Sequence, residues 1–210
     1  MATKRQKKTP LFQLLHVGCG EKRKDRTTQA FNTSEWAETR YDIDPAVGPD
    51  IVGSVLDMSA VADVSMDAVY SSHNLEHLYA HEVGPALAEF RRVLKPQGFV
   101  VLTCPDLQSV CELVAQDKLT EPAYQSPAGP IAPIDILYGH RRAVAAGNLH
   151  MAHRCGFTQK VLAACLREAG FASVIVKRRK HRFFDLWALA SVPTLERDVL
   201  KQLAEQHFPA

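Results

Sequence analysis

The sequence has no hydrophobic run long enough to cross a membrane, and its cysteines form no C-x-x-C pair. A membrane-spanning helix needs about 20 mostly apolar residues, whereas the first apolar run, residues 11–17, is short and is interrupted by Gln13 and His16. Five cysteines, an odd number without paired spacing, argue against a disulfide framework and against a zinc knuckle. We therefore expect a cytoplasmic protein that does not bind membranes and whose cysteines behave as small apolar residues.

The chain also has little net charge, +2 over 210 residues, but the charge is unevenly placed. Four of the first eight residues are basic, namely Lys4, Arg5, Lys7 and Lys8. We predict that residues 1–10 form a basic, flexible tail. Residues 11–210 are predicted to form a single domain, because a chain of this length with 46% hydrophobic residues can bury one substantial core.

The first apolar run ends on Gly18-Cys19-Gly20. Glycine has no Cβ, so such a turn can adopt positive φ angles and let the backbone touch a bound small molecule. A dinucleotide fingerprint needs a further glycine three residues later, where this chain has Arg23. An acidic residue about 20 positions on is typical of a ribose site, and Asp42 fits, with Asp44 as the alternative. The pattern favours a nucleoside cofactor over NAD.

Hydrophobic patterns predict buried strands alternating with helices in the first half of the chain, which is typical of a parallel sheet. Strands are expected to end near residues 42–44 and to span 51–55, 68–72 and 99–103, with a helix over 79–94 and a turn at 95–98. Later helices are expected near 107–116, 159–169 and 195–207, and an antiparallel hairpin is expected from residues 172–177 and 183–190.

Five motifs stand in order along the first half of the chain: His16–Gly20, Tyr41–Pro45, Val55–Met58, Ser72–His77 and Phe90–Gly98. Together they resemble the class I S-adenosylmethionine-dependent methyltransferases, closest to the small type 11-like group, over about residues 11–107. The resemblance implies a doubly wound α/β fold whose seven-stranded sheet is mostly parallel and has an antiparallel last strand. It also implies a helix after the glycine turn and S-adenosyl-L-methionine as the cofactor. We predict, in addition, a helical and loop cap inserted at about residues 120–157.

The resemblance implies cofactor contacts by position. The methionine and ribose portion falls to Gly18, Cys19, Gly20 and Asp42, the adenine to Ile43, Asp57 and Met58, and the sulfonium to Ser72 and His73. An acidic residue at a strand end is also a common turn former, so Asp57 by itself is open to either role.

Methyl transfer depends mainly on placing a nucleophile in line with the methyl group, and a base is needed only for some acceptors. His73 and His77 are candidate bases with Asn74 as the residue that orients them; the alternative is that they only pack against or cap the next helix. The H-x-x-E-H pattern formed by residues 73–77 also matches a zinc motif, which would need a helix and a third ligand. Because the motif directly follows a strand, we predict no metal site.

A second polar cluster follows the proline-rich segment 121–133. Five of its residues are predicted to contact the acceptor, namely Tyr138, His140, Arg141, His150 and His153. In this hypothesis Arg141 or Arg142 faces an anionic group. The alternative is that the cluster stabilises an interface between two copies of the chain, which would make a homodimer.

The predicted function is methyl transfer to a small-molecule or secondary-metabolite acceptor. A nucleic-acid (RNA) methyltransferase is the alternative suggested by the basic tail and by residues 177–182. It is less favoured because strand four is followed by Ser-Ser-His-Asn rather than by an Asn/Asp-Pro-Pro-aromatic motif, and because aromatic residues are not interleaved with the charges. A non-catalytic, cofactor-binding accessory subunit is the alternative outside catalysis.

Overall fold

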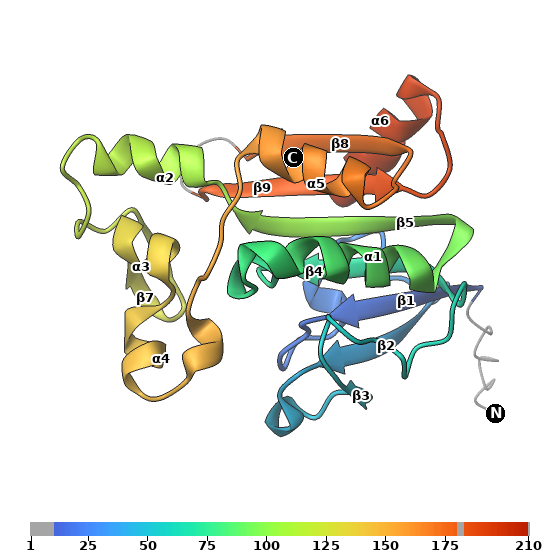
Figure 1. The fold of residues 1–210 in the computed structure, drawn as a ribbon, viewed down its shortest axis with the longest axis horizontal. Helices are drawn as coiled ribbons and strands as arrows, with labels where there is room; N and C mark the ends of the chain where they lie inside the picture. The colour runs from blue at the N-terminus through green and yellow to red at the C-terminus, as the bar shows by residue number, and fades with distance from the viewer. Residues whose placement is uncertain (1–10, 180–182, 210) are drawn as a thin grey trace, which may run out of the picture.

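The computed structural model describes residues 11–179 and 183–209, so the predicted basic tail and part of the charged turn at 177–182 lie outside the described residues. A seven-stranded sheet forms the centre, in the order β3-β2-β1-β4-β5-β9-β8 (Figure 1). The strands are β1 (Phe12–Val17), β2 (Trp36–Asp42), β3 (Ile51–Val52), β4 (Met66–Ser72), β5 (Leu94–Pro105), β8 (Ser173–Arg178) and β9 (Asp185–Ser191). The first five are parallel, and β9 runs antiparallel to both β5 and β8. The predicted sheet with its antiparallel last strand is confirmed.

Helices cover both faces of the sheet. Helices α1 (Val83–Val93) and α5 (Gln159–Glu168) lie on one face, and α6 (Arg197–His207) lies on the other (Figure 1). Val83, Leu87 and Phe90 recur at helical spacing and are all buried, so α1 presents one continuous apolar stripe to the strands. None of the helices in residues 11–179 and 183–209 is both long and apolar enough to span a bilayer.

The connection from β1 to β2 differs from the expectation. Residues 18–35, all described, contain a short 3-10 turn at Lys24–Arg26 and no α-helix. Six residues of mostly charged character, 21–26, offer no apolar stripe for a helix to bury. Phe31 covers the sheet in place of a helix: it is fully buried, with its ring centroid 4.9 Å from that of Trp36 and 4.4 Å from that of His207.

Two strand boundaries also differ from the prediction. Strand β3 ends at Val52 rather than Val55, and the next residues form a tight turn in which the Asp57 N–H donates to the Ser54 carbonyl at 3.1 Å. Strand β5 starts at Leu94, because Leu94 pairs with Met66 before the register shifts at residues 95–98. The expected proline-glycine turn therefore lies inside a bulged strand.

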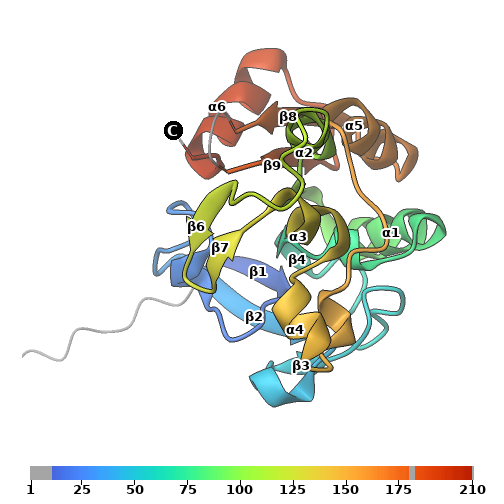
Figure 2. The same cartoon turned by 90° about the vertical axis from the view of Figure 1, so that its left-hand side faces the viewer.

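Residues 120–157 include a small hairpin and two short helices. The hairpin is β6 (Tyr124–Ser126) with β7 (Gly129–Ile131), and the helices are α3 (Pro133–Tyr138) and α4 (Arg141–Ala145); α2 (Leu107–Val114) precedes them. Figures 1 and 2 show this segment beyond the carboxyl ends of the parallel strands, where β1 and β2 point. Ligands of parallel α/β sheets bind at that edge. We call residues 120–157 the cap from here on.

Candidate functional site

A cavity of about 290 Å³ lies at the carboxyl ends of the parallel strands. Segments following β1, β2, β3 and β4 line it, together with the last part of the cap. Its walls include eight residues that the sequence analysis named: Gly18, Gly20, Asp42, Ile43, Asp44, His73, Asn74 and His150. We call this space the donor cavity, because the sequence-based expectation places the methyl donor beside the glycine turn.

The two glycines of the first turn are needed for different reasons. Both have positive φ angles, 62° at Gly18 and 51° at Gly20. A Cβ at Gly18 would lie 2.8 Å from Cγ of Asn74, so this glycine admits the Asn74 side chain. A Cβ at Gly20 would meet nothing within 4 Å. Gly20 therefore keeps open a space that belongs to the donor cavity.

Asp42 ends β2 and holds the glycine turn in place. Its Oδ2 accepts a hydrogen bond from the Gly20 N–H at 2.7 Å, and its Oδ1 accepts one from the Asp44 N–H at 3.0 Å. Each carboxylate oxygen can accept a second bond. Asp44 instead turns its carboxylate onto the Ala46 N–H at 2.8 Å, as the cap of a 3-10 turn. Between the two acidic candidates, the geometry favours Asp42 as the group that faces a ribose.

Arg40, which the sequence analysis missed, braces the same turn. Its side chain is 4% exposed, and its guanidinium donates to the carbonyls of Gly20, Lys22, Val47 and Gly48. These carbonyls belong to the loops after β1 and after β2, so one cation ties together two walls of the donor cavity. The available signal was a charged residue two positions before Asp42, next to the buried Tyr41.

A second cavity, of about 320 Å³, adjoins the first. We call it the acceptor cavity, because residues that were expected to contact the acceptor line it. Both cavities are lined by Gly18, Gly20, His73, His77 and Met151. The far walls of the acceptor cavity are largely apolar and come from the cap and from the start of β9: Tyr124, Ile131, Ile136, Phe183 and Phe184. The two spaces meet at the end of β4.

His73 stands at this junction in an unusual backbone conformation. Its φ of 53° lies in the left-handed region that is uncommon for non-glycine residues. Its Nδ1 lies 3.1 Å from Oε1 of Glu76, whose side chain is 1% exposed. Burial acts to lower the pKa of His73, but the hydrogen bond and the charge of Glu76 outweigh it and raise that pKa above its ordinary value. The sequence analysis did not name Glu76 as a site residue, although the H-x-x-E spacing was the signal.

The structure brings most of the predicted site residues to the two cavities. His140 and His153, predicted to contact the acceptor, line the acceptor cavity, and Ile43, predicted to contact the cofactor, lines the donor cavity. Cys19 and Ser72 were predicted for the cofactor but line the acceptor cavity, and His150 was predicted for the acceptor but lines the donor cavity. Asn74, predicted to orient a histidine, instead lies against Gly18 and donates to Oγ of Ser71 at 3.3 Å. Its amide therefore supports the glycine turn.

Four predicted site residues are not among the described residues that line the two cavities. Asp57 is exposed and accepts from the Ser59 N–H at 3.1 Å, and Met58 is fully buried in the core. Ser54 and Val55 line the donor cavity in their place. The tight turn after β3 explains the difference, because it directs Asp57 to solvent.

Tyr138 and Arg141 are the other two predicted site residues that line neither cavity. Tyr138 is 67% exposed, and the Arg141 Nε donates to Oδ1 of Asp135 at 2.6 Å. Although burial acts to raise the pKa of Asp135, hydrogen bonds from Arg141 and from the backbone hold it at about 2. This ion pair engages the guanidinium that was expected to face an anionic acceptor.

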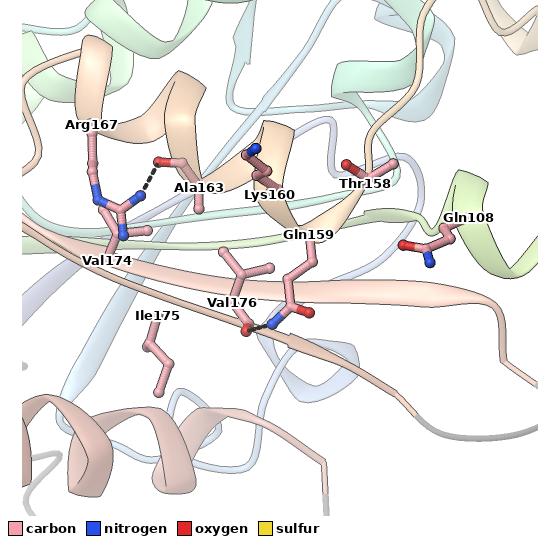
Figure 3. Close-up of a pocket in the computed structure, with 9 residues that line it drawn as sticks. All are labelled: Gln108, Thr158, Gln159, Lys160, Ala163, Arg167, Val174, Ile175 and Val176. Atoms are coloured by element: carbon pink, nitrogen blue, oxygen red, sulfur yellow. Dashed lines mark hydrogen bonds between the residues drawn. The ribbon is translucent and has the colours of Figure 1, made fainter.

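A separate hollow of about 480 Å³ lies between α5 and β8 (Figure 3). Its described lining residues include none that line the donor or acceptor cavity. Figure 3 shows two of its polar side chains bonded to backbone carbonyls, Gln159 to Val176 at 2.6 Å and Arg167 to Ala163 at 3.4 Å.

Comparison with known proteins agrees with this geometry. Residues 15–102 match the family model of the methyltransferase domain. The structure also resembles Burkholderia thailandensis 1,6-didemethyltoxoflavin-N1-methyltransferase, solved with bound S-adenosylhomocysteine, at a TM-score of 0.53. The two chains are 17% identical, and the match covers 87% of this chain and 71% of that one. Residues 15–102 are thus similar to a methyltransferase domain, and the chain shares its fold with the Burkholderia enzyme.

Two further structures show the same fold. A methyltransferase of Methanosarcina mazei matches this chain at a TM-score of 0.56 and 16% identity, over 88% of this chain and 93% of that one. A protein of Bordetella parapertussis matches at 0.54 and 17% identity over 88% of this chain, which spans 63% of that longer protein. A comparison with curated protein sequences gives no match. At these identities the structural likeness establishes the fold.

Proposed function

We propose that this chain transfers a methyl group from S-adenosyl-L-methionine in the donor cavity to a small molecule in the acceptor cavity. The observation that carries the proposal is the junction of the two cavities at Gly18, Gly20, His73 and His77. With the ribose at Asp42, the sulfonium end of the donor reaches that junction. The acceptor then approaches from the opposite side, as an in-line displacement requires.

The walls of the acceptor cavity indicate what kind of molecule it takes. Aromatic and aliphatic side chains form one part, and the imidazoles of His73, His140 and His153 form another. These groups suit a compact, partly apolar acceptor with a hydroxyl or amine group. A cavity of about 320 Å³ is the size of a small-molecule site, which favours a metabolite over RNA. The Burkholderia methyltransferase, by its name, also acts on a small molecule.

We assign His73 as the base that takes a proton from the reacting hydroxyl or amine of the acceptor. Its side chain is 49% exposed, lines both cavities and is held by the buried Glu76 carboxylate. A base with a carboxylate behind it is a recurrent arrangement for taking a proton from a hydroxyl or amine. His77 borders the same junction, while His140 and His153 contribute to the acceptor walls.

The test is a transfer assay with the full chain and S-adenosyl-L-methionine labelled in its methyl group. Metabolite, RNA and protein pools are offered separately, and we expect the label in the metabolite pool. His73→Asn should lower turnover roughly 100-fold or more, the usual effect of losing a general base, while the affinity for the cofactor stays unchanged. Label in RNA or protein would contradict the assignment of the acceptor. Label in none of the pools, with the cofactor bound, would favour a non-catalytic accessory subunit.

A further inference from the structure

Three side chains with metal-binding chemistry converge on one wall of the acceptor cavity. Glu76 and His77 come from the 3-10 turn Leu75–His77 after β4, and His153 comes from the cap. Each offers a ligand atom, and these atoms all lie within 4.8 Å of one another. The rings of His77 and His153 are 4.9 Å apart, centroid to centroid. We call these three residues the Glu-His-His cluster.

Backbone hydrogen bonds fix the two segments against each other. The N–H groups of Arg154 and Cys155 donate to the Glu76 carbonyl, at 2.8 Å and 3.3 Å. Within the cap, the His153 N–H donates to the Tyr138 carbonyl at 3.2 Å. Gly139 forms a β-bridge with Ala152, and a Cβ at Gly139 would lie 2.0 Å from the Met151 carbonyl oxygen. The cluster is therefore assembled by main-chain contacts that do not depend on its own side chains.

Both imidazoles are oriented by carbonyl groups. His77 Nδ1 lies 3.1 Å from the Ala152 carbonyl oxygen, and His153 Nδ1 lies 2.7 Å from the Ile136 carbonyl oxygen. A carbonyl oxygen only accepts, so in each neutral ring Nδ1 carries the proton and Nε2 carries a lone pair. Histidines that bind metal ions are held in this way, with the other ring nitrogen donating to a carbonyl or carboxylate.

Glu76 supplies an unpartnered charge. Its side chain is 1% exposed, and Oε1 is paired with Nδ1 of His73. Oε2 is buried and has no hydrogen-bond partner among the residues that the structure describes. A buried polar atom left without a partner costs free energy, more so when it is charged. A cation beside Oε2 would remove that cost.

We propose that Glu76, His77 and His153 bind a divalent transition-metal ion of the zinc type. Two imidazoles and one carboxylate are a ligand set used by zinc and by neighbouring first-row metals. The sequence-based expectation of no metal rested on the position of the H-x-x-E-H motif directly after a strand, since a zinc motif of this kind needs a helix and a third ligand. The fold supplies that ligand from the cap, far along the chain.

Three protein ligands leave at least one coordination position for a non-protein group. All three members of the Glu-His-His cluster line the acceptor cavity, so an oxygen atom of the acceptor is the group that this position would take. This last step rests on the proposed function. The binding of the ion does not, since it can be measured without cofactor or acceptor.

The test titrates Zn²⁺ and Co²⁺ into the metal-free full chain by calorimetry, and follows Co²⁺ by its visible absorption. We expect one ion per chain and a Co²⁺ spectrum of low coordination number. His153→Ala should weaken binding roughly 100-fold or more, since even the loss of a residue that only supports a ligand costs 10- to 100-fold. The matched control is His150→Ala, which removes an exposed histidine of the donor cavity and should leave metal affinity unchanged.

Several results would overturn the proposal. The first is the absence of stoichiometric metal binding. The second is equal metal affinity in His153→Ala and in the parent chain. The third is a loss of metal affinity in His150→Ala as large as that in His153→Ala. Thiolate charge-transfer bands in the Co²⁺ spectrum would place the ion on a cysteine and would also overturn it. Thermal unfolding shows whether each variant folds. If His153→Ala does not, the isosteric Glu76→Gln decides, with the same expected loss of affinity. Metal binding can fail while methyl transfer persists, so the two proposals are separable.

Discussion

Replacing Asp42 by asparagine tests the donor cavity with a change of only one atom. In the parent chain both carboxylate oxygens accept from backbone N–H groups, one on Gly20 and one on Asp44. Asparagine offers a single acceptor oxygen and an NH₂ group, so one of these N–H groups would face a donor. The variant therefore loses one bond that shapes the glycine turn, and it loses the negative charge that we propose receives the ribose hydroxyls.

The size of the effect follows from the kind of bond that is lost. Hydrogen bonds to charged groups contribute about 1.5–3 kcal/mol each. Losing about 2–3 kcal/mol of binding free energy raises the dissociation constant roughly 30- to 150-fold. The unpaired N–H group beside Asn lowers the free energy of unfolding by about 1–3 kcal/mol.

Calorimetry with S-adenosyl-L-methionine measures the binding change, and urea unfolding measures the stability change. The matched control is Asp44→Asn, because the Asp44 carboxylate caps the Ala46 N–H at 2.8 Å and an asparagine oxygen can do the same. We expect this control to change the affinity less than threefold, within the scatter of about 0.5 kcal/mol usual for surface substitutions. Equal losses in both variants, or none in Asp42→Asn, would refute the reasoning.

Three other substitutions test the rest of the framework. Gly20→Ala places a methyl group in open cavity space at a φ of 51°. The variant should lose only about 1–3 kcal/mol of its free energy of unfolding in urea, but calorimetry should detect no cofactor binding. Unchanged affinity for the cofactor would contradict the placement of the donor. Arg40→Leu leaves four backbone carbonyls without their donor and should lower the free energy of unfolding by roughly 2–4 kcal/mol. An unchanged free energy of unfolding would show that the hydrogen bonds from Arg40 are not needed to hold the two loops. Burial lowers the pKa of His207 from 6.5 to about 4. As the pH falls, the unfolded chain therefore binds a proton at this histidine before the folded chain does. The contribution of neutral His207 to the free energy of unfolding is fully present above pH 6.5, and about 3 kcal/mol of it is lost as the pH drops towards 4. His207→Leu should flatten that part of the pH profile of urea unfolding, and an unchanged slope would assign it to other groups.

Most strands could be predicted because the sequence carries their signals locally, whereas the architecture of the sheet was implied by the family resemblance. The run from Phe12 to Val17 is apolar and ends in glycine, and Phe99 to Thr103 is a dense buried strand. The stripe of Val83, Leu87 and Phe90 has the spacing of a helix on a sheet. Each signal lies within a few residues, so tertiary contacts were not needed to recognise it.

The parts that could not be predicted depend on contacts between distant segments. Phe31 replaces the expected helix only because it meets Trp36, Phe99 and His207 from three other parts of the chain. Arg40 is useful only where two loops bring their carbonyls together. No local pattern records either arrangement.

The same limit applies to the residues of the site. Gly18 and Asp42 belong to motifs with fixed spacing, and both line the donor cavity, while their contact with a cofactor stays a prediction. Asp57 has the right residue type, but the turn after β3 directs it to solvent, and neighbouring residues line the cavity instead. His153 meets Glu76 only through the backbone bonds that join the cap to the end of β4.

The most direct test of the central claim is a crystal structure of the chain with S-adenosylhomocysteine, the product left after methyl transfer. We predict the ligand in the donor cavity, with the ribose hydroxyls on the Asp42 carboxylate, the amino-acid portion along Gly18 to Gly20, and the sulfur at the junction beside His73. Ligand bound in the hollow between α5 and β8, or a donor cavity that stays empty at saturating concentration, would contradict the account.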